Sequence, residues 1–383
     1  MNINEKALQL HKEWNGKLET VAKSKVNSRE DLALAYTPGV AEPCKVIAKD
    51  PEAAYTYTWK SNTVAVVSDG SAVLGLGNIG PYAAMPVMEG KCVLFKEFGD
   101  VNAVPICLDT QDTEEIIEAV KNIAPGFGGI NLEDISAPRC FEIEERLKEM
   151  LNIPVFHDDQ HGTAIVVLAG IINGLRVTGK KKEDCHVVVN GAGSAGIAIT
   201  KLLLRYGFKH VMMCDREGII GKDYPNLNWM QKNMTEVTNL ENKSGTLADA
   251  LKGADIFVGV SAPNIVSPEM VASMNKDAII FAMANPVPEI MPDVAKAAGA
   301  KVVGTGRSDF PNQVNNVIAF PGIFKGALEG RATQITEEMK LAAAEALAGL
   351  VSDEQINEDF IMPEAFDPRV AEVVSQAVKS HVR

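Results

Sequence analysis

The chain is long and acidic: it has 383 residues, of which 46% are hydrophobic and 23% charged, and a formal net charge of −13. This length is enough for two or three domains with large cores. The acidic balance excludes general affinity for nucleic acid, because phosphate binding needs clustered Lys and Arg and no such run stands out.

The N-terminal segment has apolar residues at helical spacing over residues 3–24 and then breaks into the turn-rich segment DLALAYTPGVAEP, which contains Tyr36. Because this segment is charged and amphipathic, it does not resemble a signal peptide. The longest apolar segment, residues 164–175, is too short to span a bilayer, and the six cysteines are scattered without a CxxC pair. We therefore expect a cytoplasmic protein with reduced thiols and no membrane contact.

From residue 62 to residue 156, segments of strand character alternate with helical segments. The expected strands are NTVAVVSD, KCVLFKEF, AVPICL, GGINL and IPVF, and helices are expected after Pro81, in DTEEIIEAVKNIA and after Pro138. This alternation predicts an α/β layer with mostly parallel strands. We assign residues 1–162 to an N-terminal α/β catalytic domain.

Two pairs of acidic residues follow short apolar runs in this domain: Glu133 with Asp134, and Asp158 with Asp159. Open α/β sheets hold their ligands at the carboxyl ends of their strands. Oxygen ligands from two strand ends suit a hard divalent ion such as Mg²⁺ or Mn²⁺. The alternative is that Asp158 and Asp159 cap a helix that begins near Gly162.

A second domain, residues 163–383, contains the best local motif. In CHVVVNGAGSAGIAITKLLLRYG, a β-branched strand runs into a glycine loop that opens an apolar helix, and the next strand, HVMMCD, ends at Asp215. This order is typical of a Rossmann-type doubly wound dinucleotide-binding domain, in which the loop approaches the pyrophosphate and the acidic residue approaches the ribose. The residues expected to contact the cofactor are Gly191, Ala192, Gly193, Ser194, Ala195 and Gly196.

The same glycine spacing occurs at Gly75, Gly77 and Gly80. There the preceding strand is short, Pro81 follows the third glycine, and no acidic residue closes the next strand as Asp215 does. The later copy is therefore the better candidate for the nucleotide. The apolar runs ADIFVGV, DAIIFAMAN and KVVGTG continue its sheet, and the C-terminal segments return to helix, over residues 335–351 and after Asp367 and Pro368.

A nucleotide site together with a divalent-ion site indicates metal-assisted oxidation, which needs an acid and a base. Lys91 begins the expected strand KCVLFKEF, where loss of water would lower its pKa and make it a candidate base. Its alternative is a solvated lysine at a strand edge. For Tyr36 the alternative is packing within a loop.

Eight segments occur in the order found in malic enzymes, and the chain resembles the short bacterial-type form of that family. They are AYTPGVAEP, SDGSAVLGLGNIG, EGKCVLFKEFG, NLEDI, FHDDQHGTA, NGAGSAG, ANPVPE and NNVIAFPG, and the resemblance runs from about residue 32 to residue 324. The resemblance implies oxidative decarboxylation of L-malate to pyruvate and CO2 with reduction of NAD or NADP.

The resemblance also implies roles for single residues. Glu133, Asp134 and Asp159 are similar to the family's metal ligands, with Asp158 beside them, while Lys91 matches the base and Tyr36 the acid. Asn285 and Asn315 match positions that hold substrate or the nicotinamide end of the cofactor, and Asn316 is the alternative to Asn315. Longer members carry an arginine after the DG of SDG, where this chain has Ser71 and Ala72. Which cation meets the distal carboxylate of malate is therefore open, and a homodimer is the family expectation.

Two further choices remain at the level of sequence. Asp215 favours NAD because a carboxylate repels the 2′-phosphate of NADP, but the adjacent Arg216 could bind that phosphate, so NADP stays possible. The other functions considered are a metal-independent NAD-linked hydroxy-acid or amino-acid dehydrogenase and a non-catalytic nucleotide-binding regulatory subunit. The acidic pairs argue against the first. The complete set of Tyr36, Lys91 and three carboxylates argues against the second.

Overall fold

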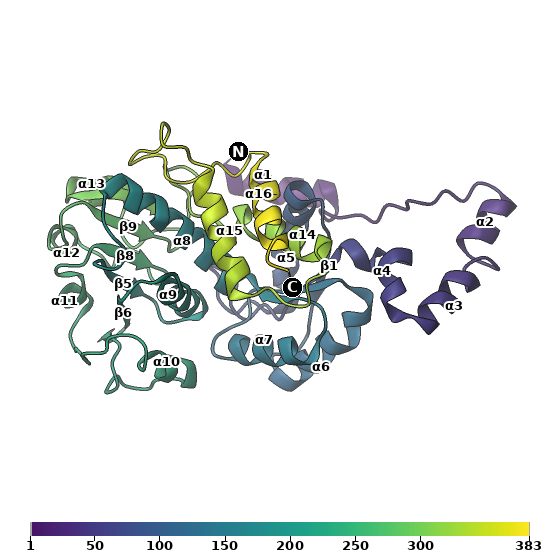
Figure 1. Cartoon of the computed structure of the whole chain (residues 1–383), viewed down its shortest axis with the longest axis horizontal. Helices are drawn as coiled ribbons and strands as arrows, with labels where there is room; N and C mark the ends of the chain where they lie inside the picture. The colour runs from purple at the N-terminus through teal and green to yellow at the C-terminus, as the bar shows by residue number, and fades with distance from the viewer. Residues whose placement is uncertain (1, 383) are drawn as a thin grey trace.

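The structure, a computed structural model that describes residues 2–382, contains two parallel sheets joined by one long helix (Figure 1). The predicted fold class is confirmed: an α/β chain with a Rossmann-type second sheet and C-terminal helices. The boundary predicted between residues 162 and 163 falls inside the joining helix and stays a prediction.

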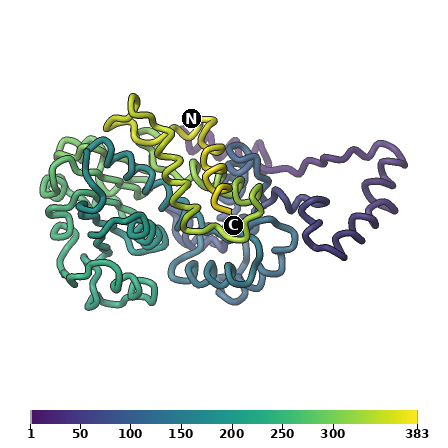
Figure 2. The backbone as a smooth tube through the Cα atoms, viewed as in Figure 1, coloured from purple at the N-terminus to yellow at the C-terminus, as the bar shows by residue number. Residues whose placement is uncertain are grey.

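The chain begins with short helices that contain no buried residue. They are α1 (Ile3–Trp14), α2 (Arg29–Ala35), α3 (Ala41–Lys49), η1 (Pro51–Ala53), α4 (Ala54–Tyr57) and η2 (Trp59–Asn62). The helix predicted over residues 3–24 ends at Trp14, because Asn15 and Gly16 adopt positive φ angles of 54° and 102°. Figures 1 and 2 show α2 and α3 on an arm that extends away from the rest of the chain.

The first sheet has four strands in the order β2-β1-β3-β4, all parallel. Its elements are β1 (Thr63–Ser68), α5 (Gly80–Gly99), β2 (Asn102–Cys107), α6 (Thr113–Ile123), η3 (Ala124–Gly126), β3 (Gly129–Leu132), α7 (Arg139–Met150) and β4 (Val155–His157). The central strand β1 is valine-rich and buried at every position, as expected for a parallel strand covered on both faces.

One predicted strand of this sheet is wrong. The run KCVLFKEF forms the second half of α5, in which Ala84, Met88, Cys92 and Phe95 are buried at helical spacing. Consecutive apolar residues are compatible with either a strand or a buried helix, and here the helical spacing that starts before the run decides. Lys91 therefore projects from the buried face of a helix and not from a strand edge.

The joining helix, α8 (Asp158–Thr178), begins earlier than predicted and has 21 residues. By length and composition it could cross a membrane, but 61% of its apolar window is buried inside the molecule. It packs against α9 and α15. A helix that is apolar on most sides is a core helix when other elements surround it. The acidic pair Asp158 and Asp159 forms its first turn and does not lie in a preceding loop.

The second sheet has six strands in the order β10-β9-β8-β5-β6-β7, all parallel except β7. Its elements are β5 (His186–Asn190), α9 (Ser194–Tyr206), β6 (His210–Asp215), β7 (Gly218–Ile219), α10 (Trp229–Met234), α11 (Leu247–Leu251), β8 (Ile256–Gly259), α12 (Pro268–Ala272), β9 (Ala278–Ala282), α13 (Pro292–Ala297) and β10 (Ala300–Thr305). The strand order reverses between β5 and β8, which is where doubly wound sheets bind ligands.

The C-terminal helices pack against helices of both halves of the chain: α14 against α5, and α15 against α8 and α9. They are η4 (Asn316–Ile318), α14 (Phe320–Glu329), α15 (Glu337–Gly349) and α16 (Val370–Lys379). Helix α14 packs against α5 and α16, and Phe95 of α5 meets Phe320 and Phe324 edge to face at ring distances of 4.7 and 5.3 Å. The last helix begins at Val370, after a turn in which Asp367 accepts from the Arg369 backbone N–H, so Asp367 is not its N-cap as predicted.

Candidate active site

The two predicted acidic pairs lie side by side because of strand register. Leu132 of β3 pairs with His157 of β4, so the residues that follow each strand become neighbours. The Asp134 backbone N–H donates to Asp159 Oδ2 at 2.8 Å. Carboxylate oxygens of Glu133, Asp134 and Asp159 lie within 4.8 Å of one another. The structure thus brings together the three residues for which the sequence predicted a metal role.

The electrostatics of this cluster fit a divalent cation. Burial raises the pKa of Asp134 to about 9, with the carboxylates of Asp159 and Glu133 adding to the effect. Burial also raises the pKa of Asp159, to about 6. Asp134 Oδ2 is buried and has no hydrogen-bond partner among residues 2–382. Three crowded carboxylates with an unsatisfied oxygen are the donor set that Mg²⁺ or Mn²⁺ binds in proteins.

Lys91 reaches this cluster from α5. Its Nζ lies 2.6 Å from Asp158 Oδ2, 2.8 Å from Glu133 Oε1 and 4.2 Å from the centre of the Phe320 ring. Burial acts to lower the pKa of Lys91, but Asp158 and then Glu133 outweigh it and the pKa is raised. The lowered pKa predicted from desolvation alone is therefore wrong for this arrangement, because the sequence did not reveal two carboxylates at contact distance.

Asp158 has a different environment from Asp159. Its Oδ2 accepts from Lys91 and also from Asn316 Nδ2 at 2.5 Å, while its Oδ1 is buried without a partner among the described residues. The N-cap of α8 is His157, without a side-chain capping bond, which leaves the helix-capping alternative for Asp158 and Asp159 without support. Asp158 instead links the lysine to the segment that contains Asn316.

A cleft of about 450 Å³ connects this cluster with the glycine loop. It is lined by Asp159, by residues 193–196, and by the three predicted asparagines, Asn285, Asn315 and Asn316. The Asn315 side chain caps η4 by accepting from the Val317 backbone N–H at 3.0 Å. The structure therefore gathers the predicted substrate residues and the predicted nicotinamide end of the cofactor site in one cavity.

The glycine loop has the geometry of a nucleotide turn. Gly191 has φ +108°, and a Cβ there would lie 2.5 Å from the carbonyl oxygen of Val260. A Cβ on Gly196 would lie 1.7 Å from the Gly191 oxygen, whereas one on Gly193 would meet nothing within 4 Å. The outer two glycines are thus required by packing, and the middle one leaves room for close approach of a phosphate. The earlier copy at Gly75 also borders the cleft, but on the side of the first sheet.

The cleft continues into a larger cavity of about 1140 Å³ around the end of β6. Gly193, Val260 and Ser261 line both cavities, and Asp215 and Arg216 line the larger one. Asp215 Oδ1 accepts from the Arg216 backbone N–H at 2.9 Å, and the Arg216 side chain is exposed. Asp215 and Arg216, on which the predicted choice between NAD and NADP depends, thus lie together in a groove that continues from the cleft.

Tyr36 is not brought to this site within one chain. It follows α2 on the projecting arm, its side chain is 68% exposed, and within residues 2–382 it forms only backbone hydrogen bonds (Figures 1 and 2).

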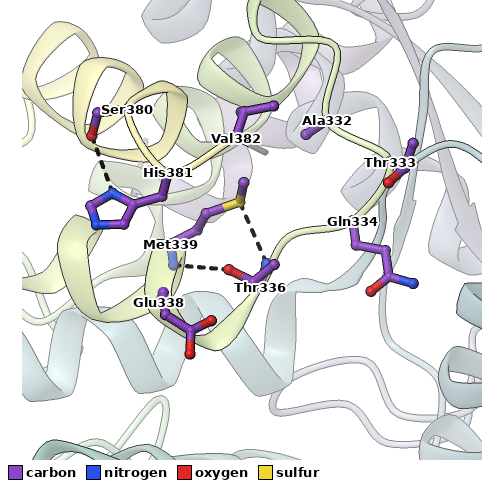
Figure 3. Close-up of a pocket in the computed structure, with 9 residues that line it drawn as sticks. All are labelled: Ala332, Thr333, Gln334, Thr336, Glu338, Met339, Ser380, His381 and Val382. Atoms are coloured by element: carbon purple, nitrogen blue, oxygen red, sulfur yellow. Dashed lines mark hydrogen bonds between the residues drawn. The ribbon is translucent and has the colours of Figure 1, made fainter.

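Some contacts were not predicted from the sequence. Asn131 Nδ2 donates to Glu133 Oε2 at 2.8 Å. The sequence could have indicated such a contact, because an asparagine in the buried strand β3 needs a polar partner. The contact between the Phe320 ring and Lys91 could not be predicted from the residues around either one, since it depends on how α14 packs against α5. A further cavity of about 310 Å³ between the start of α15 and the end of α16 is lined by none of the predicted residues (Figure 3).

Comparison with known families covers almost the whole chain. Residues 15–148 match the malic enzyme N-terminal domain, and residues 160–382 match the malic enzyme NAD-binding domain. The chain is similar to the bifunctional malic/malolactic enzyme of Bacillus subtilis, with 59% identity over 99% of this chain and 92% of that protein. It is also similar to the NAD-dependent malic enzyme of Geobacillus stearothermophilus, with 58% identity over 99% of this chain and 78% of that protein.

The fold is similar to that of a solved malic enzyme. The crystal structure of the NAD-dependent malic enzyme of Thermotoga maritima superposes with a TM-score of 0.94 at 54% identity, covering 97% of this chain and 98% of that one. Relatives named as NADP-dependent malic enzymes also match nearly the full length of this chain.

Proposed function

This chain belongs to the malic enzyme family and oxidatively decarboxylates L-malate to pyruvate and CO2 with NAD or NADP, and we propose that it does so in the cleft between its two sheets. The observation that carries this proposal is the shared cavity: Asp159 of the carboxylate cluster and residues 193–196 of the glycine loop line the same cleft. The metal-independent dehydrogenase and the non-catalytic subunit receive no support from the comparisons.

Glu133, Asp134 and Asp159 would hold the divalent ion, Mg²⁺ or Mn²⁺, through their carboxylate oxygens. When bound, the ion would polarise the C2 oxygen of malate and take up the charge of Glu133, which otherwise stabilises the Lys91 ammonium. Lys91 Nζ would then accept the proton of the C2 hydroxyl as hydride leaves for the nicotinamide. Asp158 keeps Nζ in place throughout, since it contacts the lysine without belonging to the ligand cluster.

Asn285 and Asn315 would orient the substrate and the nicotinamide ring, because both line the cleft beside the glycine loop. At the other end of the groove, residues 191–196 would hold the pyrophosphate and Asp215 the ribose, which favours NAD over NADP. Loss of CO2 leaves an enolate that needs a proton at C3, and the Tyr36 hydroxyl would supply it. We place the enzyme in the cytoplasm.

Tyr36 can take this role only if the arm of one chain reaches the site of another. The arm helices bury no residue of their own, and they expose Leu32, Leu34 and Val46. Apolar residues exposed together mark an interaction surface. Leu76, in the loop before α5, and Tyr82, in the first turn of that helix, are likewise exposed, and α5 is the helix that carries Lys91. A homodimer that places each arm on the partner's α5 would cover both surfaces.

This pairing is tested by the mass of the protein in solution. Light scattering should give twice the chain mass of 41.1 kDa. A monomer at the concentrations at which the enzyme is fully active would overturn the proposal.

The reaction itself is tested by a steady-state assay with malate, each cofactor in turn and a divalent ion. Malate-dependent NADH formation should be matched by equal amounts of pyruvate, should stop on chelation with EDTA and should return with Mn²⁺ or Mg²⁺. Activity that survives EDTA would favour the metal-independent dehydrogenase instead.

The division between base and acid is tested by partial reactions. Lys91→Ala should stop hydride transfer from malate, whereas Tyr36→Phe should chiefly impair protonation of the enolate and should still reduce oxaloacetate with NADH. If both variants lose every partial reaction to the same degree, the assignment of roles is wrong.

A further inference from the structure

One buried carboxylate outside the cluster accepts hydrogen bonds from three residues around the first turn of α8, the turn that carries Asp159. Glu144 of α7 is 3% exposed. Its carboxylate accepts from the His157 backbone N–H at 3.3 Å, from Gln160 Nε2 at 3.2 Å and from His161 Nε2 at 2.8 Å. These residues flank Asp158 and Asp159 on both sides, so a single side chain holds the start of α8 before and after the acidic pair.

Two lysines add to this arrangement, Lys148 on the same helix as Glu144 and Lys340 on α15. Lys148 Nζ lies 2.6 Å from Glu144, and Lys340 Nζ of α15 lies 3.0 Å from His161 Nδ1. Lys340 is 2% exposed, and the start of its helix is fixed by a bond from the Met339 backbone N–H to the Thr336 hydroxyl (Figure 3). The C-terminal half of the chain thus contributes to the geometry of the turn.

The hydrogen-bond partners fix the state of the His161 ring. An ammonium can only donate and a carboxylate can only accept, so Nδ1 accepts from Lys340 and the Nε2 hydrogen points to Glu144. Burial lowers the pKa of His161 to about 4, against the opposing effect of Glu144, and the ring is neutral near pH 7. Burial alone would raise the pKa of Glu144, but His161 and Lys148 hold it well below its usual value. The partners of Glu144 are hydrogen-bond donors and an ammonium, all of which favour its anionic form.

We propose that Glu144 is a positioning residue for the divalent-ion site: it fixes the first turn of α8 so that Asp159 faces Asp134 while Asp158 faces Lys91. The proposal rests on the ion site proposed above. Glu144 forms no hydrogen bond with Asp134, Asp158 or Asp159 among the described residues, so it acts only through the residues next to them.

The need for such a tether follows from the charges in the cluster. Glu133, Asp134 and Asp159 repel one another whenever they are ionised without a cation between them, which is the state in which they would bind the ion. Asp159 is carried by a different element from the other two. A free turn would relax by moving Asp159 away, and binding of the ion would have to reverse that movement. Partners that orient metal ligands in this way are worth about 10- to 100-fold in metal affinity.

The test measures Mn²⁺ binding directly, by the electron paramagnetic resonance signal of the free ion, and NADH binding by fluorescence. Glu144→Gln keeps the size of the side chain but replaces an acceptor oxygen with a donor that faces other donors. It should weaken Mn²⁺ binding about 10- to 100-fold. The Kd for NADH should change by less than about twofold, because the cofactor groove has no contact with Glu144.

The matched control is Glu142→Gln, which removes the same charge from the same helix. Glu142 is exposed, and within residues 2–382 its side chain bonds only Arg146, so Mn²⁺ binding should stay at the wild-type value. Lys340→Met is a second variant that alters the turn from α15, and it should weaken Mn²⁺ binding less than Glu144→Gln while leaving NADH binding unchanged. It carries the test if Glu144→Gln does not fold.

Two results would overturn the positioning role. One is Mn²⁺ binding in Glu144→Gln and Lys340→Met as tight as in Glu142→Gln. The other is an equal loss of Mn²⁺ and NADH binding, which would indicate general damage to the fold. Asp159→Ala separates the role of Glu144 from the existence of the ion site. If Asp159→Ala binds Mn²⁺ as the wild type does, the proposed ion site is wrong. If Asp159→Ala loses Mn²⁺ binding but Glu144→Gln and Lys340→Met do not, the ion site is supported and the positioning role of Glu144 is wrong.

Discussion

At the level of single residues, four carboxylates within one small region are divided between two tasks. Asp158 and Glu133 bind the Lys91 ammonium, while Glu133, Asp134 and Asp159 offer oxygens to a common point. Glu133 belongs to both groups, so its charge is shared between the lysine and the proposed ion. We expect a bound ion to draw on the charge of Glu133 and so to lower the pKa of Lys91, which Asp158 would then hold alone.

Removing one carboxylate of the ligand cluster tests this division. Asp159→Ala should lower kcat/KM for malate by about 10²-fold or more, because several kcal/mol of stabilisation by the ion depend on its ligands. NADH binding, measured by fluorescence, should be nearly unchanged. Asp184→Ala, an exposed carboxylate before β5, is the matched control and should be fully active. Near-normal turnover in Asp159→Ala would remove the site.

A second residue-scale prediction concerns the choice of cofactor. Asp215→Ser should raise kcat/KM for NADP relative to NAD by at least about tenfold, because it removes a negative charge that faces the 2′-phosphate. Arg216 would then supply the phosphate contact, so adding Arg216→Ala should reverse the gain. The measurement is kcat/KM for both cofactors in the three proteins. A wild-type enzyme that already prefers NADP would contradict the role given to Asp215 and assign it to Arg216.

At the level of elements, the sequence predicted what depends on local order and missed what depends on packing. Strand β5, the glycine loop, helix α9 and strand β6 follow one another along the chain. All four were predicted in this order, and β6 ends at Asp215 as predicted. The acidic pairs were found because residues after parallel strands meet at one sheet edge. Lys91 was assigned to a strand because the four residues after it, CVLF, are all apolar and do not reveal a period. The contacts of Glu144 with α8 were missed because they depend on how α7 packs against the start of α8, which no local pattern reveals.

The packing of α14 on α5 leads to a stability prediction. Phe324 is fully buried and meets Phe95 of the helix that carries Lys91. Phe324→Ala should lower the free energy of unfolding by about 3–5 kcal/mol. Phe366→Ala, which truncates a ring that is 84% exposed, should change it by less than about 0.5 kcal/mol. Urea denaturation of both variants checks this, and equal stabilities would mean that α14 does not support α5.

At the level of the whole molecule, one chain contains the carboxylate cluster, Lys91 and the groove along the glycine loop, but Tyr36 lies on the projecting arm. The arm has helices without a buried residue, and Figures 1 and 2 show how far it extends from the sheets. Such an arm has little reason to stay ordered in isolation, since folding needs apolar burial to offset the loss of chain entropy. We therefore propose that the complete site is assembled from two copies of the chain.

The most direct test combines two variants that are each inactive in pyruvate formation, Tyr36→Phe and Lys91→Ala. Co-expression with different tags allows the mixed dimer to be purified. If the arm acts on the partner subunit, one of its two sites receives an intact Tyr36 and an intact Lys91, and the mixed dimer should recover about half of the wild-type malate-dependent activity. If Tyr36 acts within its own chain, neither site is complete, and a mixed dimer as inactive as its parents would contradict the account.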